Sequence, residues 1–149
     1  NEETQEVELV PTIASAAMMH YEDALRRATY TTEAHVNGPQ GDLRGDRVEL
    51  YFGASQHELE RVESYQQVKL LLTDRIATGM QLTYFTEDGR YVMRGAPVQI
   101  LEDFPDECRE TVGKTLTFFR STDTISVDGN EEVRTQTRTT GSCPPPQFH

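Results

Sequence analysis

Apolar and polar residues alternate along most of this chain with a period of two. Met80, Leu82 and Tyr84, for example, alternate with small or polar residues. Alternation over about four to eight residues is typical of β-strands that bury one face. Further runs with this spacing are Ala28, Tyr30, Thr32, Ala34 and Val36; Val48, Leu50 and Phe52; Val68, Leu70 and Leu72; Leu116 and Phe118; and Ile125 and Val127.

Turn-forming residues separate these runs. Asn37-Gly38-Pro39, Glu87-Asp88-Gly89 and Asp128-Gly129-Asn130 are turn signals, and the last two are good hairpin candidates. Consecutive strands joined by short turns form an antiparallel meander. We therefore predict an all-β fold of roughly eight to ten strands, arranged as a sandwich, a jelly roll or an incomplete barrel.

The segment Ser15–Tyr30 fits two interpretations. It is rich in helix-favouring residues, and its apolar residues also have helical spacing, at Met18, Tyr21, Leu25 and Ala28. However, its counterpart in the second half of the chain, Thr78–Val92, has the pattern of a hairpin. We expect strands here, with a short helix as the alternative.

The second half of the chain weakly repeats the first. Gly45 corresponds to Gly113, for example, and similar strand-forming residues surround each glycine. Strand repeats usually stack on their neighbours, each covering an apolar face that the other cannot bury alone. The two degenerate repeats, about residues 14–72 and 76–138, are expected to share one interior.

These repeats form one expected domain, over residues 14–140. The chain has 149 residues, enough for one domain with a core of its own. Residues 1–13 are mostly polar and acidic, so we expect a flexible N-terminal segment. Residues 141–149 are Pro-rich, and because proline cannot donate a ladder hydrogen bond, this tail is expected to end the domain.

The chain is strongly acidic, with a formal net charge of −11 and a pI of about 4.7. Binding to nucleic acid requires clustered Lys and Arg, so we expect no nucleic-acid partner. The same charge disfavours anionic membrane surfaces. No run of about 18 apolar residues is present, so no membrane-spanning segment is expected.

Cys108 and Cys143 flank the last predicted hairpin, among loop-type residues. A disulfide between them would stabilise the fold by roughly 3–4 kcal/mol; free thiols, or a disulfide between two chains, are the alternatives. Loop cysteines favour an oxidising compartment. The start at Asn1 fits a removed signal peptide or an expression boundary. We expect a periplasmic or extracellular protein.

The sequence offers no catalytic constellation. We find no phosphate loop, dinucleotide fingerprint or nucleophile elbow. His20, His35 and His149 lie far apart, neither cysteine has a histidine nearby, and the acidic residues lack the spacing of a calcium loop. We expect a protein that is not an enzyme and that has no cofactor and no metal.

The remaining candidate site is the apolar face of the strands. It fits either an ordinary filled core or a groove between two sheets that accepts acyl chains. Alternation alone does not separate the two. The residues expected to line such a groove are Met80, Leu82, Tyr84, Met93, Val98, Ile100, Leu116, Phe118, Ile125, Val127, Leu50 and Phe52.

Several strand motifs, taken in order, resemble the OstA-like family. The motifs are Ala77–Tyr84, Tyr91–Ile100, with its aromatic residue, glycine and valine, Thr111–Phe119 and Ile125–Arg134, with a fainter copy at Leu43–Leu50. The resemblance covers about residues 14–137. The family includes periplasmic lipopolysaccharide-transport proteins and the N-terminal domain of the outer-membrane lipopolysaccharide-assembly protein.

This resemblance implies a twisted, V-shaped antiparallel jelly roll of two facing sheets, whose interior holds lipid A acyl chains. It also implies open first and last strands, through which copies or related OstA-like domains join end to end. Such pairing is physically reasonable, because an exposed strand edge can accept another strand.

Two functions follow as hypotheses. The first is a non-enzymatic periplasmic carrier or bridge component for lipopolysaccharide or a similar acylated amphiphile. The second is a self-assembling structural β-protein that forms head-to-tail fibres and has a filled core.

Overall fold

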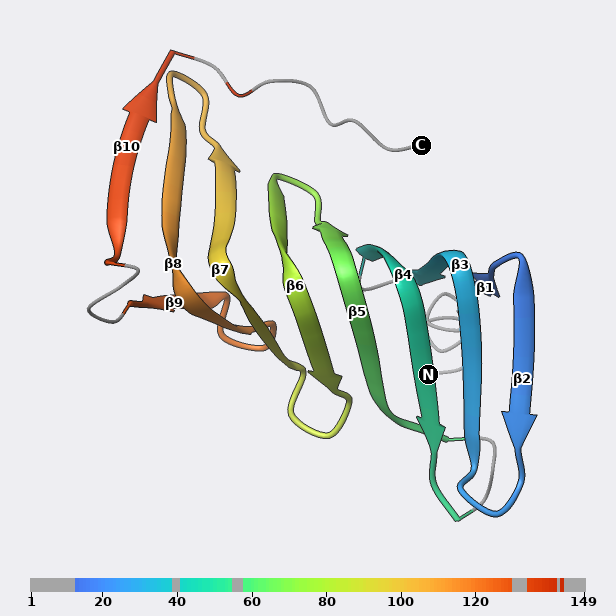
Figure 1. Ribbon diagram of the computed structural model, residues 1–149. Helices are drawn as coiled ribbons and strands as arrows, with labels where there is room; N and C mark the ends of the chain where they lie inside the picture. The colour runs from blue at the N-terminus through green and yellow to red at the C-terminus, as the bar shows by residue number, and fades with distance from the viewer. Residues whose placement is uncertain (1–12, 39–40, 55–57, 130–133, 142, 144–149) are drawn as a thin grey trace, which may run out of the picture.

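The computed structural model describes residues 13–38, 41–54, 58–129, 134–141 and 143. It contains a ten-stranded antiparallel sheet (Figure 1). Its strands are β1 (Ile13–Ser15), β2 (Met18–Glu22), β3 (Arg27–Gly38), β4 (Gly41–Phe52), β5 (Leu59–Leu71), β6 (Arg75–Phe85), β7 (Arg90–Asp103), β8 (Cys108–Phe119), β9 (Thr124–Asp128) and β10 (Gln136–Thr140). The all-β prediction is confirmed, and Ser15–Tyr30 forms strands rather than a helix.

The six long strands β3 to β8 form a meander in which each strand pairs with the next. Short strands cover both edges of this meander (Figure 1). β1 and β2 pair with opposite halves of β3. At the other edge, β10 and β9 pair with opposite halves of β8. The sheet is not closed into a barrel, so β1 and β2 form one outer edge and β9 and β10 the other.

A line of β-bulges crosses the sheet at the same level in each pair from β3–β4 to β7–β8. A bulge adds a residue to a strand, bends it and increases its twist. Because the bulges lie side by side, they fold the sheet along a line that we call the crease. The register shifts lie between Thr31 and Ala34, Arg44 and Arg47, Tyr65 and Val68, Thr78 and Gln81, and Arg94 and Val98.

The crease divides the sheet into two arms. The first arm contains β1, β10 and residues 34–38, 41–45, 68–71, 75–79, 98–103 and 108–113. The second arm contains β2, β9 and residues 27–31, 47–52, 59–65, 81–85, 90–94 and 115–119.

The crease also turns the apolar sides of both arms toward each other. In β4 the buried residues other than Glu49 are Leu43 and Gly45 before the crease and Val48 and Leu50 after it, so the alternation shifts by one position there. The buried residues of the two arms form one hydrophobic cluster. The fold is therefore the predicted twisted jelly roll, with a single interior between two arms.

Glycines allow the close approach that the crease requires. A Cβ atom on Gly79 would lie 2.8 Å from Cγ of Met93 and 2.9 Å from the backbone oxygen of Arg94. Met93 is fully buried, so it has no free space to move into. Gly45 and Gly113, which correspond in the two sequence repeats, also lie at the crease.

The predicted disulfide between Cys108 and Cys143 is confirmed. It joins the first residue of β8 to a residue that follows β10. All five side chains of β10 are exposed, so β10 has little apolar burial of its own to hold it against β8. The expected N-terminal segment, apart from Ile13, and most of the Pro-rich tail fall outside the described residues.

Replacing Gly79 with alanine tests the packing at the crease. We expect Gly79→Ala to lower the free energy of unfolding by about 1–3 kcal/mol, because the added methyl group overpacks a site bounded by backbone. Urea unfolding measures the change. Gly141→Ala is the matched control, since nothing lies within 4 Å of its Cβ position. Equal stability of both variants would contradict a close-packed crease.

Removing the disulfide tests its contribution to stability. The bond closes a loop between residues 35 positions apart, so Cys143→Ser should lower the free energy of unfolding by about 3–4 kcal/mol. Hydrogen exchange of the β10 amides should also accelerate. Reduced wild-type protein should behave like the variant; an unchanged urea midpoint in both would refute this role.

Candidate functional site

The structure packs the innermost of the expected groove residues beside the crease. Leu82, Met93, Val98 and Leu116 are each at most 1% exposed. These side chains fill the interior next to the crease and leave no room for a ligand there. Farther from the crease, Leu50, Tyr84, Ile100 and Phe118 are also buried, and Phe52, Ile125 and Val127 are partly buried against the same cluster.

Met80 is placed differently from the other expected groove residues. Its side chain is 57% exposed. The bulge between Thr78 and Gln81 interrupts the alternation that would place Met80 on the same face as Leu82. A one-residue shift in register exchanges the two faces of a strand, and the sequence pattern does not reveal this one.

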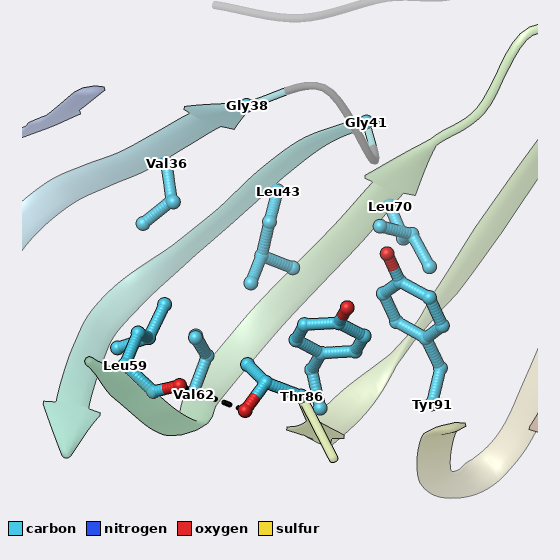
Figure 2. Close-up of a pocket in the computed structure, with 10 residues that line it drawn as sticks. Val36, Gly38, Gly41, Leu43, Leu59, Val62, Leu70, Thr86 and Tyr91 are labelled. Atoms are coloured by element: carbon cyan, nitrogen blue, oxygen red, sulfur yellow. Dashed lines mark hydrogen bonds between the residues drawn. The ribbon is translucent and has the colours of Figure 1, made fainter. Parts of the chain in front are cut away.

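An apolar cavity of about 190 Å³ lies between the arms, away from the crease (Figure 2). The first arm contributes Val36, Leu43 and Leu70, and the second contributes Leu59 and Val62. Figure 2 shows these side chains directed into the same space. Its remaining lining residues are Gly38, Gly41, Tyr84, Thr86 and Tyr91. Of the expected groove residues, Tyr84 lines this cavity.

Hydrogen bonds to the backbone fix the polar side of this cavity. The Thr86 hydroxyl donates to two backbone carbonyl oxygens, that of Leu59 at 2.7 Å and that of Glu60 at 3.0 Å. Thr86 thereby ties the turn after β6 to the beginning of β5. The contact leaves the apolar side chain of Leu59 at the rim of the cavity.

Tyr84 and Tyr91 bring aromatic rings to the cavity. Their ring centroids are 4.4 Å apart, and Tyr91 also stacks on Phe118 at 5.8 Å. Burial raises the pKa of Tyr91 above its ordinary value, and the neighbouring Tyr84 adds to the shift. The Tyr91 phenol therefore stays neutral at physiological pH. The cavity consequently presents apolar surface and neutral hydroxyl groups rather than charge.

A second cavity, of about 540 Å³, opens between the arms near β9 and β10. Ile100, Ile125 and Val127 form its apolar part, and all three are expected groove residues. Charged and hydroxyl side chains line the rest of it, namely Arg75, Glu102, Arg109, Thr111, Asp123, Thr135 and Thr137.

Sequence reasoning missed most of the lining of the first cavity. The apolar alternation includes Val36 and Leu70, so it places them on a buried face. The alternation does not tell how far a residue lies from the crease. That distance decides whether an inward side chain fills the core or borders a cavity. One sequence signal does indicate which residues of these strands face inward. The five-residue pattern Arg-Val-Glu-x-Tyr occurs at residues 47–51 and again at residues 61–65.

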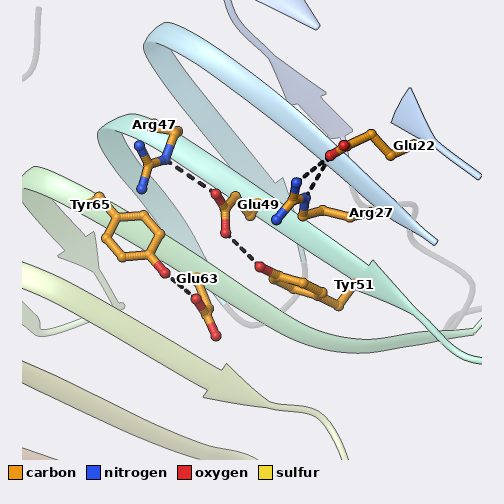
Figure 3. Close-up of polar contacts among 7 residues, drawn as sticks. All are labelled: Glu22, Arg27, Arg47, Glu49, Tyr51, Glu63 and Tyr65. Atoms are coloured by element: carbon orange, nitrogen blue, oxygen red, sulfur yellow. Dashed lines mark hydrogen bonds and ion pairs between the residues drawn. The ribbon is translucent and has the colours of Figure 1, made fainter. Parts of the chain in front are cut away.

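These two segments pair antiparallel, so that Glu49 lies opposite Glu63 on the outer face of the second arm (Figure 3). Arg61 stacks over the Tyr51 ring at 4.0 Å, and Arg47 stacks over Tyr65 at 4.3 Å. The pattern thus marks a polar outer face, with Val48 and Val62 directed inward.

Each glutamate of this pair is held by one arginine and one tyrosine. The Tyr51 hydroxyl donates to Glu49 at 2.6 Å, and Arg61 pairs with Glu63 at 2.7 Å. Burial, together with a hydrogen bond to Glu63, raises the pKa of Tyr65 to about 12. Charge compensation of this kind lets two carboxylates lie side by side. The contacts of Arg61 with Tyr51 and of Arg47 with Tyr65 join β4 to β5 on this face.

Within the described ranges, no group of three or more His, Cys, Asp or Glu side chains could hold a metal ion. The described part of the chain also has no helix long and apolar enough to cross a membrane. The two cavities make the space between the arms the candidate site.

Comparison with known proteins gives a match in fold. No protein-family model and no curated protein sequence matches the chain. Among solved structures, it is similar to LptH from Pseudomonas aeruginosa, the LptA-homologous periplasmic component of the lipopolysaccharide transport device. The TM-score is 0.71 at 16% sequence identity, and the match covers 93% of this chain and 98% of LptH. This chain therefore shares its fold with a periplasmic component of lipopolysaccharide transport.

Proposed function

We propose that this protein is a non-enzymatic carrier or bridge component that binds lipopolysaccharide or a similar acylated amphiphile between its two arms. The observation that carries the proposal is the apolar cavity lined by both arms. The fold shared with a lipopolysaccharide-transport component supports the same ligand class. The periplasm is the proposed location, and the Cys108–Cys143 disulfide suits that oxidising compartment.

The lining of the cavity fits an acyl chain. Each buried methylene contributes roughly 0.8 kcal/mol, so a chain gains affinity from the apolar side chains alone. Headgroup charge is a weaker source of affinity, because the chain carries a net charge of −11 and phosphates would be repelled. Binding should therefore depend on the tails of the amphiphile.

The N-terminal edge of the sheet supports association with a second copy or a related domain. Met18 and Met19 on β2 are 62% and 59% exposed, and Ile13 on β1 is 62% exposed. Exposed apolar residues on an edge strand, which is paired on one side only, favour the addition of another strand. β9 and β10 lie at the opposite end of the described sheet, so pairing of one end with the other would join copies head to tail.

A structural fibre is the second candidate. The closely packed side chains beside the crease favour it, because Leu82, Met93 and Val98 are fully buried and leave no space there. In this case the protein would assemble through the same edges, and assembly would be independent of lipid.

Light scattering tests end-to-end association. The mass of the wild-type protein should rise with concentration, and Met19→Lys should keep it monomeric, because a charge on an edge strand disfavours pairing. Met80→Lys is the control, since Met80 is equally exposed but lies on the central strand β6. A monomeric wild type at high concentration would contradict both the bridge and the fibre.

Displacement of a fluorescent acyl probe tests ligand binding. Lipopolysaccharide should displace the probe from the wild type. Leu59→Trp should weaken binding about tenfold or more, because the indole fills space equivalent to about two methylenes or more. Leu59 lines the cavity.

Leu25→Trp is the matched control for this experiment, since Leu25 is 55% exposed in the turn between β2 and β3. It should bind the probe as the wild type does. If lipopolysaccharide displaces no probe from the wild type, or if both tryptophan variants bind equally, the carrier proposal fails. Assembly that persists without any lipid binding would then favour the fibre.

A further inference from the structure

The two cavities between the arms are separated by a row of contacting side chains. Tyr91, which lines the apolar cavity, stacks on Phe118. The guanidinium carbon of Arg75, which lines the second cavity, lies 5.5 Å from the centre of the Phe118 ring. Arg75 thus stands where a chain would pass from one cavity to the other.

Arg75 is held in this position by carboxylates. Its side chain is only 16% exposed. Its Nε lies 3.4 Å from Glu102 and 3.8 Å from Asp74, both on the first arm or the turn that leads into it. Its Nη1 donates to Asp123 at 2.7 Å. A guanidinium in this place puts a charge between the apolar cavity and the apolar part of the second cavity.

The contact with Asp123 joins the two arms. Arg75 begins β6 on the first arm, whereas Asp123 lies in the turn that leads into β9 on the second, 48 positions away. The ion pairs of Arg47 and Arg138, by comparison, each join residues of one arm. The hydrogen bond from Arg75 holds the pKa of Asp123 below its ordinary value. The pair therefore stays charged at neutral pH.

The apolar cavity is small, so the position of Arg75 matters for the binding of a long acyl chain. Its 190 Å³ is close to the roughly 150 Å³ of a cavity that takes up one benzene-sized molecule. It is smaller than the roughly 300–1,000 Å³ of most small-molecule sites. A short acyl chain fits within it, whereas a long chain has to continue into the second cavity, past Arg75.

We propose that Arg75 and Asp123 form a gate between the two cavities, and that this gate determines how long an acyl chain the groove accepts. The inference rests on the proposed function, because it assumes that the groove binds acyl chains. With the pair closed, the arms are joined across the path, and a chain in the apolar cavity cannot continue into the second cavity. With the pair open, both cavities form one continuous groove.

The gate should be easy to open. The Asp123 side chain is 69% exposed, and ion pairs with an exposed partner have small interaction free energies. Removing the Asp123 charge should therefore raise the affinity for a long chain by about three- to fivefold. The affinity for a chain that ends before the gate should not change.

Calorimetric titration of octanoate and palmitate into wild-type and variant protein tests the gate. Asp123→Asn removes the charge, and asparagine tolerates the φ of 55° at this position. Asp88→Asn is the matched control, because Asp88 is a half-exposed turn residue paired with Arg90 at 3.6 Å within the second arm. We expect Asp123→Asn to bind palmitate about three- to fivefold more tightly and octanoate unchanged, and Asp88→Asn to match the wild type.

The outcomes separate the two proposals. If wild type binds palmitate and Asp123→Asn binds it no more tightly, the gate is wrong and the carrier proposal stands. An equal gain for octanoate, or the same gain in Asp88→Asn, would also overturn the gate, because general loosening or loss of charge would explain it. If neither fatty acid binds to the wild type, the carrier proposal fails and the gate fails with it.

Discussion

The line of β-bulges that crosses five neighbouring strand pairs is the constraint on which the rest of the structure depends. Without it, the sheet would have one apolar face open to water, and a flat apolar face of that size is unstable in a monomer. The bulges bend every long strand at the same level, so the sheet covers its own apolar face. Glycines such as Gly79 avoid a steric clash there, because the neighbouring strand lies too close at the crease for a side chain.

The same bend produces a gradient in packing across the interior. Side chains next to the crease, such as Leu82 and Met93, are closely packed and fully buried. Side chains farther out, such as Leu43 and Leu59, border a cavity because the arms diverge. The filled core and the groove that the sequence could not separate therefore coexist at different depths. No charged residue lines the first cavity, whereas Arg75, Glu102, Arg109 and Asp123 line the second.

Much of the fold, but little of the site, could be predicted from the sequence. Alternation identifies strands reliably because one face of each is buried, and the resemblance of the strand motifs to the OstA-like family indicates the bent jelly roll. The position of Cys108 and Cys143 around one hairpin favours a disulfide but leaves a bond between two chains open, and the structure joins them within one chain. The bulges are not visible in the alternation, so the alternation places Met80 on the inner face, whereas its side chain is exposed. Cavity residues such as Val62 depend on tertiary geometry, which the spacing of apolar residues does not contain.

Photolabelling with a photoreactive palmitate analogue tests the central claim most directly, because it reports where an acyl chain lies without relying on a variant. Tryptic peptides of the labelled protein would be mapped by mass spectrometry. We expect label on residues that line the space between the arms, such as Leu59, Tyr84 and Tyr91, and we expect lipopolysaccharide to suppress it. Label confined to the exposed residues of β1 and β2, or label that lipopolysaccharide does not reduce, would contradict a groove that carries acyl chains between the arms.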